Sequence, residues 1–183
     1  SPMTKRIRLV PDNDYQWDYD DDIKIAYLAK SRYCLGTEAV TPERMAEIRD
    51  GVQSGDLVGL PVFAYVHSGV VLSTGAFNDP WDSGRSGFVY SKDKSVTHDQ
   101  LRGYLAAFNQ YLAGDVWGFI AEEQVEMTGQ REDGTLVERG EWVEIDSCWG
   151  FLGSNPETNG MKDHVKELLK QGYVWTDEEG NAI

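Results

Sequence analysis

The order of apolar and polar residues predicts several strands along the chain. Residues 5–10 alternate basic with apolar side chains, which is typical of a short strand. Residues 62–67 and 70–74 flank Ser68-Gly69, and this pattern predicts a β-hairpin. The other predicted strands are residues 86–90 and two longer runs, 116–127 and 142–149, which are separated by a turn at 132–135.

Helical spacing predicts two shorter helices in the first third of the chain. Ile23, Ala26 and Tyr27 follow three aspartates, which complement the positive end of a helix dipole, and this helix is expected to end near Gly36. In the second helix Thr41 is the cap, Pro42 the first residue and Gly51 the end, with Met45 and Ile48 on one face.

Two further helices are predicted later in the chain. Thr97 and Gln100 form a capping box for a helix whose apolar residues recur at three- and four-residue intervals until Gly114 ends it. A last helix over residues 160–171 places Met161, Val165, Leu168 and Leu169 on one face.

These elements indicate the α+β class: a mainly antiparallel sheet of about five to six strands with three to four helices packed on it. The 183 residues lie within the usual size of one domain, and no repeat or linker divides them. We therefore expect residues 1–183 to form a single domain. Ser1-Pro2, ahead of Met3, resembles a remnant of cloning.

The charge balance is consistent with a basic protein as the partner, and the alternative is that the acidity only keeps the protein soluble. Thirty-one acidic residues against 17 basic ones give a net charge of −14. Direct binding to nucleic acid or to an acidic membrane surface is not expected, because both need cationic side chains. No apolar run approaches the roughly 18 residues of a membrane span, and two cysteines fit a reducing compartment. We expect a cytoplasmic protein, and its oligomeric state stays open.

The acidic residues gather in two regions. Residues 11–22 hold six aspartates interleaved with Tyr15, Trp17 and Tyr19, and residues 121–183 hold 15 acidic and five basic residues. Aromatic rings among acids favour an interaction surface, with a solvated acidic face or loose Mg²⁺ or Ca²⁺ binding as alternatives. An EF-hand loop starting at Asp12 fails, because Trp17 and Ile23 would take the glycine and glutamate positions. The expected partner-binding residues are Asp14, Trp17, Asp18, Asp20, Asp21, Asp22, Glu122, Glu123 and Glu126.

Two motifs, at residues 80–84 and 146–151, place Asp, Ser and Trp beside glycine. In one interpretation the rings fill the core, and the polar side chains cap turns. In the other, the motifs form one pocket in which Cys148 is the nucleophile, His67 or His98 is the base, and Asp82 or Asp146 orients that base. The chain has no zinc-ligand spacing, G-x-G-x-x-G motif or P-loop, so neither a metal nor a cofactor is expected.

The sequence also resembles a family of small accessory proteins carried by phages and mobile elements. The segments that carry the resemblance are Pro80-Trp81-Asp82-Ser83-Gly84 and Asp146-Ser147-Cys148-Trp149-Gly150-Phe151, with Gly59-Leu60-Pro61-Val62, His67-Ser68-Gly69 and Gly87-Phe88-Val89-Tyr90. They lie in a motif-bearing core of about residues 50–153. The resemblance implies an accessory role in a bacterial host cell and assigns no catalytic residue.

Charge, the acidic-aromatic segment and this resemblance together predict an acidic phage or mobile-element protein. It would bind and inhibit a host DNA-binding or defence protein, with carboxylates standing in for the phosphates of nucleic acid. One alternative is a small cysteine-dependent hydrolase or transferase centred on Cys148, and an enzyme is the less favoured class. The other alternative is a structural or oligomerising accessory domain.

Overall fold

The chain contains two compact units in a computed structural model that describes residues 3–19, 22–30, 35–66, 68–75, 83–130 and 132–183. Unit 1 comprises Ser1–Gln16 and Asp115–Ile183, and unit 2 comprises Trp17–Gly114. In the described residues nine strands form two mixed, mostly antiparallel sheets, accompanied by four helices, and this confirms the α+β class. The strands form two sheets of four and five strands instead of one sheet of five to six. The single domain over residues 1–183 stays a prediction.

Unit 2 is built on the five-stranded sheet, in the order β3-β2-β6-β4-β5. Strands β2 and β3 run parallel, and the other neighbours are antiparallel. The antiparallel pairing of β4 with β5 confirms the hairpin predicted around Ser68-Gly69. The strands are β2 (Ile23–Leu28), β3 (Glu38–Val40), β4 (Val58–Val66), β5 (Val70–Ser73) and β6 (Ser83–Ser91).

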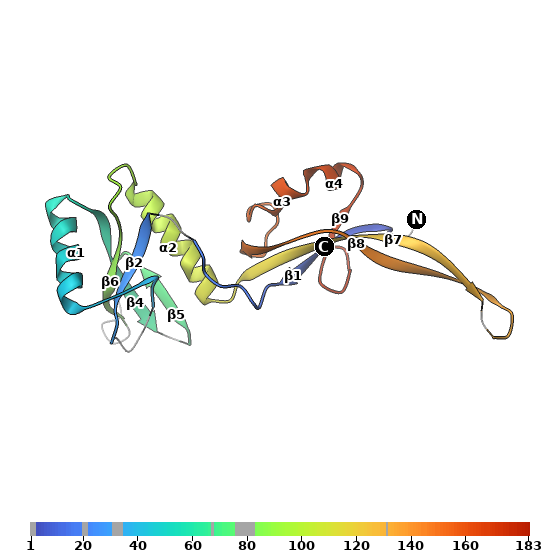
Figure 1. Cartoon of the computed structure of the whole chain (residues 1–183), viewed down its shortest axis with the longest axis horizontal. Helices are drawn as coiled ribbons and strands as arrows, with labels where there is room; N and C mark the ends of the chain where they lie inside the picture. Colours follow the sequence, from blue (N-terminus) through green and yellow to red (C-terminus); the bar gives the residue numbers. More distant parts are fainter. Residues whose placement is uncertain (1–2, 20–21, 31–34, 67, 76–82, 131) are drawn as a thin grey trace. The chain divides into compact units, whose positions relative to one another are not determined.

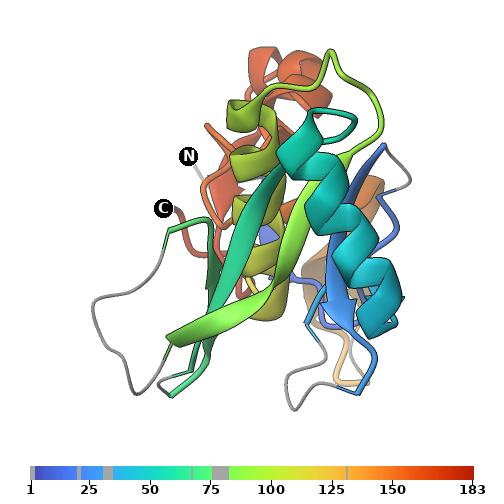
Figure 2. The same cartoon turned by 90° about the vertical axis from the view of Figure 1, so that its left-hand side faces the viewer.

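Helices cover both faces of this sheet: α1 (Pro42–Ser54) lies on one face and α2 (His98–Leu112) on the other (Figure 2). On the α2 face, Leu101, Leu105 and Phe108 pack against β-strand residues such as Val62. On the α1 face, Ile48 packs with Phe88 and other apolar residues. The predicted capping box of α2 is confirmed, with Thr97 and Gln100 bonded in both directions.

The helix predicted from Ile23, Ala26 and Tyr27 is wrong, because this segment is the strand β2. It lies between β3 and β6, and helices cover both of its faces. Ile25 belongs to the core on the α2 side, and Ala26 to the core on the α1 side. A strand buried on both faces lacks the alternation of apolar and polar residues that marks a half-exposed strand. Its apolar positions therefore also matched a helical spacing.

Helix α1 begins as predicted and ends later than predicted. The amide of Arg44 donates to the Thr41 side chain, and Pro42 is the first helical residue. The helix continues through Gly51 to Ser54, and Gly55, with φ 85°, forms the C-cap. A Cβ atom on residue 51 would lie 2.7 Å from Leu57 Cδ1, so this glycine admits the Leu57 side chain.

Unit 1 is built on the four-stranded sheet, in the order β8-β7-β1-β9. The neighbours are antiparallel except β1 and β9, which are parallel. The two longest strands form the predicted second hairpin. The strands are β1 (Lys5–Pro11), β7 (Val116–Gln130), β8 (Leu136–Leu152) and β9 (Val174–Thr176).

Two short helices, α3 (Met161–His164) and α4 (Lys166–Lys170), lie on one face of this sheet (Figure 1). Ile7, Phe119 and Phe151 of the sheet pack against the helices. The predicted apolar positions Met161, Val165, Leu168 and Leu169 all contribute to this core. The single helix predicted over residues 160–171 is interrupted at Val165, which is fully buried and has φ −113° and ψ 16°.

Candidate functional site

Trp17 anchors the unit 2 part of the acidic-aromatic segment, residues 17–19, to helix α2. Its indole Nε1 donates a hydrogen bond of 3.3 Å to the hydroxyl of Tyr104. Its ring centroid lies 5.5 Å from Tyr104, 5.0 Å from Phe108 and 5.5 Å from Tyr111. The side chain is half-buried. Trp17, predicted as a partner contact, therefore also has a structural role, which is to hold the segment on the helix.

Trp17, Tyr19 and Asp22 of the segment form a groove of about 400 Å³ with α2 in unit 2. Tyr19 is 47% exposed, and its ring lies 4.7 Å from Trp17 between centroids. Asp22 and Tyr104 line the same groove. The other lining residues are Trp17, Ile23, Val96, Gln100 and Ala107. Sequence reasoning identified Trp17 and Asp22 but could not add the α2 residues, because only folding brings α2 to the segment.

The other predicted aspartates are distributed over the two units. Asp14 is exposed in unit 1, whereas Asp18 and Asp22 are exposed in unit 2. Asp20 and Asp21 lie outside the described residues.

Glu122 is bound internally by two arginines of β1. Its Oε1 atom accepts hydrogen bonds from Arg8 Nε at 2.7 Å and from Arg6 Nε at 2.9 Å. Arg6 also stacks on Trp142, with its Cζ atom 3.8 Å from the ring centroid. Burial raises the pKa of Glu122, but the hydrogen bonds from Arg8 and Arg6 outweigh burial and lower this pKa. Since Glu122 is only 8% exposed, we do not count it among the side chains that can meet a partner.

Glu123 and Glu126 occupy different environments. Glu123 is half-buried beside Tyr173, and burial followed by the nearby Glu123 carboxylate raises the pKa of Tyr173. The backbone of Glu126 pairs with Gly140 in the hairpin, while the side chain of Glu126 lies outside the described part of the structure.

The hairpin carries exposed acids that were not predicted as partner contacts. Glu141 and Glu144 are exposed, and neither has an ion-pair or hydrogen-bond partner within the described residues. Asp146, predicted only as an orienting group in a catalytic site, is exposed too and accepts a hydrogen bond from the Ser147 amide. In the sequence, Val143 and Ile145 alternate with Glu144 and Asp146, and this pattern indicates a strand that carries acidic side chains.

The register of the hairpin places these acids on both faces of a two-stranded ribbon. Asp146 lies opposite Ala121, and Glu141 opposite Val125, on the face that carries α3 and α4. Glu144 lies opposite Glu122, on the other face. The apolar residues Val143 and Ile145 beside them are 44% and 48% exposed.

Two β-bulges interrupt the pairing of β8 with β7, and each adds one residue on β8. At Ala121/Glu122 the extra residue is Ile145, and at Trp117/Phe119 the two residues Trp149 and Gly150 lie opposite the single Gly118. Bulges on edge strands re-aim side chains. Ile145 and Trp149 are indeed both about half exposed, at 48% and 47%. The interpretation that the tryptophan rings fill the core is therefore wrong for Trp149, whereas Trp81 lies outside the described residues.

The residues of the cysteine hypothesis do not form a described catalytic group. Cys148 is a half-buried free thiol packed at the edge of the unit 1 core, opposite Phe119. Asp146 lies two residues before it on the same strand. His98 is exposed at the start of α2 in unit 2. His67 and Asp82 lie outside the described residues.

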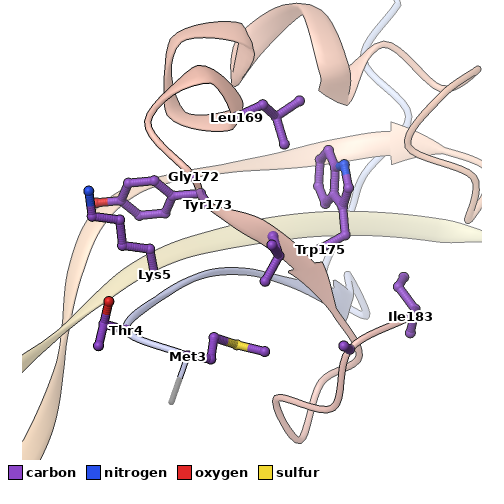
Figure 3. Close-up of a pocket in the computed structure, with 10 residues that line it drawn as sticks. Met3, Thr4, Lys5, Leu169, Gly172, Tyr173, Trp175 and Ile183 are labelled. Atoms are coloured by element: carbon purple, nitrogen blue, oxygen red, sulfur yellow. The ribbon is translucent and has the colours of Figure 1, made fainter. Parts of the chain in front are cut away.

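A second groove, of about 740 Å³, lies in unit 1 (Figure 3). It is formed by the start of β1, the end of α4, β9 and residues 182–183, with Leu169, Tyr173 and Trp175 among its apolar walls. Its lysine, Lys5, donates a hydrogen bond of 3.1 Å to the Gln171 carbonyl and lies 5.6 Å from the centre of the Tyr173 ring. Lys5 is thus engaged within the unit.

Comparison with known proteins adds no assignment: no protein family, curated protein or solved structure matches this chain. Among the described residues, no group of three or more His, Cys, Asp or Glu side chains is arranged to hold a metal ion. None of the described helices is long and apolar enough to cross a membrane.

Proposed function

We propose that this protein binds a basic host protein, a DNA-binding or defence factor, and inhibits it by occupying its nucleic-acid cleft. The observation that carries the proposal is the acidic hairpin of unit 1. Residues 116–152 contain nine acidic and two basic residues. Glu141, Glu144 and Asp146 are exposed there.

The position of these carboxylates supports insertion into a cleft. They project from both faces of the ribbon, so each wall of a basic cleft would meet negative charge. A strand advances about 3.3 Å per residue, and because of the bulge at Ile145 the β7 partners of residues 141 and 146 are four residues apart, which spreads the carboxylates over about 13 Å. One strand of DNA has a phosphate about every 3.4 Å along its axis, so the ribbon offers fewer charges over the same length.

The apolar side chains among the acids would supply contact area. Val143 and Ile145 are exposed between the three carboxylates. Charges steer the encounter and select a basic partner, whereas buried apolar area contributes the larger share of affinity. The resemblance to accessory proteins of phages and mobile elements supports a host protein as the target.

The test compares two triple variants that each remove three negative charges. E141Q/E144Q/D146N neutralises the hairpin, and E157Q/D163N/E167Q neutralises exposed acids elsewhere in unit 1. Each protein is used to capture partners from a bacterial lysate and is eluted with salt. The captured protein is then bound to a fluorescent DNA duplex, and release of the duplex is followed by polarisation.

We expect the wild type and the control variant to release the duplex at similar concentrations. The hairpin variant should need a concentration at least about tenfold higher to release the duplex, because it loses the electrostatic steering and the ion pairs of the three carboxylates with the partner. Raising the salt concentration should weaken capture by the wild type, since exposed charges are screened. Equal competition by all three proteins would reject the hairpin as the inhibitory element, and a captured partner that retains its DNA would reject mimicry.

A further inference from the structure

The groove of unit 2 presents aromatic rings in fixed positions at the surface. Trp17 is held by its hydrogen bond to Tyr104 and by the rings of Phe108 and Tyr111. Tyr19 lies against Trp17 with an angle of 37° between the ring planes and is still 47% exposed. The rings of Trp17, Tyr19 and Tyr104 thus line one groove.

The charge around this groove favours a cation. Asp22 lines the groove and is exposed, and Asp18 is exposed one residue before Tyr19. The face of an aromatic ring is negative, so rings and carboxylate attract the same kind of ligand. The remaining walls include Ile23, Val96 and Ala107, which suit a chain of methylene groups.

We infer that this groove binds an arginine side chain of a basic protein partner. A guanidinium group is planar, stacks on aromatic rings, pairs with carboxylates and is more weakly hydrated than an ammonium group. Its three methylene groups would lie along the apolar walls, as long cationic side chains do on protein surfaces. The kind of partner rests on the proposed function, whereas the ligand chemistry rests on the groove alone.

The experiment titrates three short peptides into the full-length, ¹⁵N-labelled protein. They are acetyl-Gly-Arg-Gly-amide, the same peptide with lysine, and the same peptide with citrulline, which is the neutral isostere of arginine. The indole N–H resonance of Trp17, assigned with Trp17→Phe, reports on the groove. A single side chain should bind with a Kd on the order of 1 mM, which corresponds to about −4 kcal/mol.

We expect the arginine peptide to shift this resonance to saturation, the lysine peptide to bind more weakly, and the citrulline peptide to have no effect. Asp22→Asn and Tyr19→Leu should each weaken arginine binding about fivefold. Tyr19→Phe keeps the ring and should bind like the wild type. The matched control is Asp56→Asn, which removes an exposed charge of unit 2 outside the groove.

Equal shifts by the arginine and citrulline peptides would overturn the inference, as would full binding by both Asp22→Asn and Tyr19→Leu. Unchanged amide resonances of α2 in these surface variants would show that the fold is intact. The hairpin variant E141Q/E144Q/D146N should bind the arginine peptide normally. A failed partner capture with normal peptide binding would therefore reject only the proposed function, and the reverse result only the groove.

Discussion

The two units differ in how their sheets are covered, and this difference decides which kind of surface each one offers. In unit 2 helices cover both faces of the sheet, with an apolar core on each side. In unit 1 helices α3 and α4 cover one face, and the other face carries the polar network of Arg6, Arg8, Glu122 and Trp142. The hairpin of unit 1 extends past its helices (Figure 1).

The charge follows the same division. Unit 1 holds 18 acidic and eight basic residues, and unit 2 holds 13 and nine. Few other elements cover the β7–β8 hairpin of unit 1, so side chains on both of its faces are exposed. Glu141, Glu144 and Asp146 are among these exposed side chains. The covered sheet of unit 2 instead forms a groove where a segment meets a helix. The hairpin of unit 1 therefore has a shape that suits entry into a cleft, and the groove of unit 2 has a shape that suits a single side chain.

The largest loss of stability is expected from a substitution in the core of unit 1. Phe119 is fully buried between the sheet and the helices, and Phe119→Ala should destabilise this unit by about 4 kcal/mol through a cavity. Hydrogen exchange of peptides from β1 and β7 measures the loss. If residues 17–114 lose protection to the same extent, the chain unfolds as the single domain that the sequence predicts. Unchanged protection in β7 would contradict the assigned core.

A smaller loss of stability, which depends on pH, is expected from a substitution on the polar face of unit 1. Glu122→Gln leaves two arginines without their carboxylate and should cost about 3 kcal/mol at pH 7. The pKa of Glu122 is lowered in the folded state, so its stabilising effect is present above the unfolded value of 4.5 and is lost as the pH falls.

The measurement is urea unfolding of wild type and Glu122→Gln at pH 7 and at pH 3. The gap in stability between them should narrow at pH 3. Glu144→Gln, an exposed neighbour across the strand pair, is the control and should change stability by less than about 0.5 kcal/mol. If wild type and Glu122→Gln differ equally in their free energy of unfolding at both pH values, the ionised carboxylate of Glu122 is not the cause of the difference.

The smallest effect is expected from a buried tyrosine of unit 2, and it has the opposite pH dependence. The hydroxyl of Tyr90 donates to Glu38 at 2.5 Å, and Tyr90→Phe should cost about 1.5 kcal/mol at pH 7. Burial, followed by the bond to Glu38, raises the pKa of Tyr90 to about 12 from the usual value of 10.0. Its stabilising effect is therefore present below about pH 10 and lost between pH 10 and pH 12.

Thermal unfolding of wild type and Tyr90→Phe from pH 8 to pH 12 tests this expectation. Above pH 10 the melting temperature of the wild type should fall faster than that of Tyr90→Phe. The two curves of melting temperature against pH should therefore approach one another. Curves that stay parallel would show that Tyr90 has the same pKa in the folded and unfolded chain.

Signals that depend on a few neighbouring residues were sufficient to predict much of the fold. The capping box of Thr97 and Gln100, the Thr41 cap with Pro42, and the Ser68-Gly69 turn are all local, and each marks an element that the structure contains. The short parallel strands β3 and β9 carry no such signal in three residues each. The apolar residues of strand β2 also match a helical spacing, because the helices packed against the sheet bury both faces of this strand.

For the candidate sites, the sequence determined which residues are available: many carboxylates, rings among them, and little positive charge. Only the tertiary structure decided which of these residues are free and which are engaged. Glu122 meets Arg6 and Arg8, which are 116 and 114 positions away in the chain, and Trp17 meets Tyr104, 87 positions away. Such contacts depend on strand register and helix packing over the whole chain, whereas caps and turns depend on the few residues beside them.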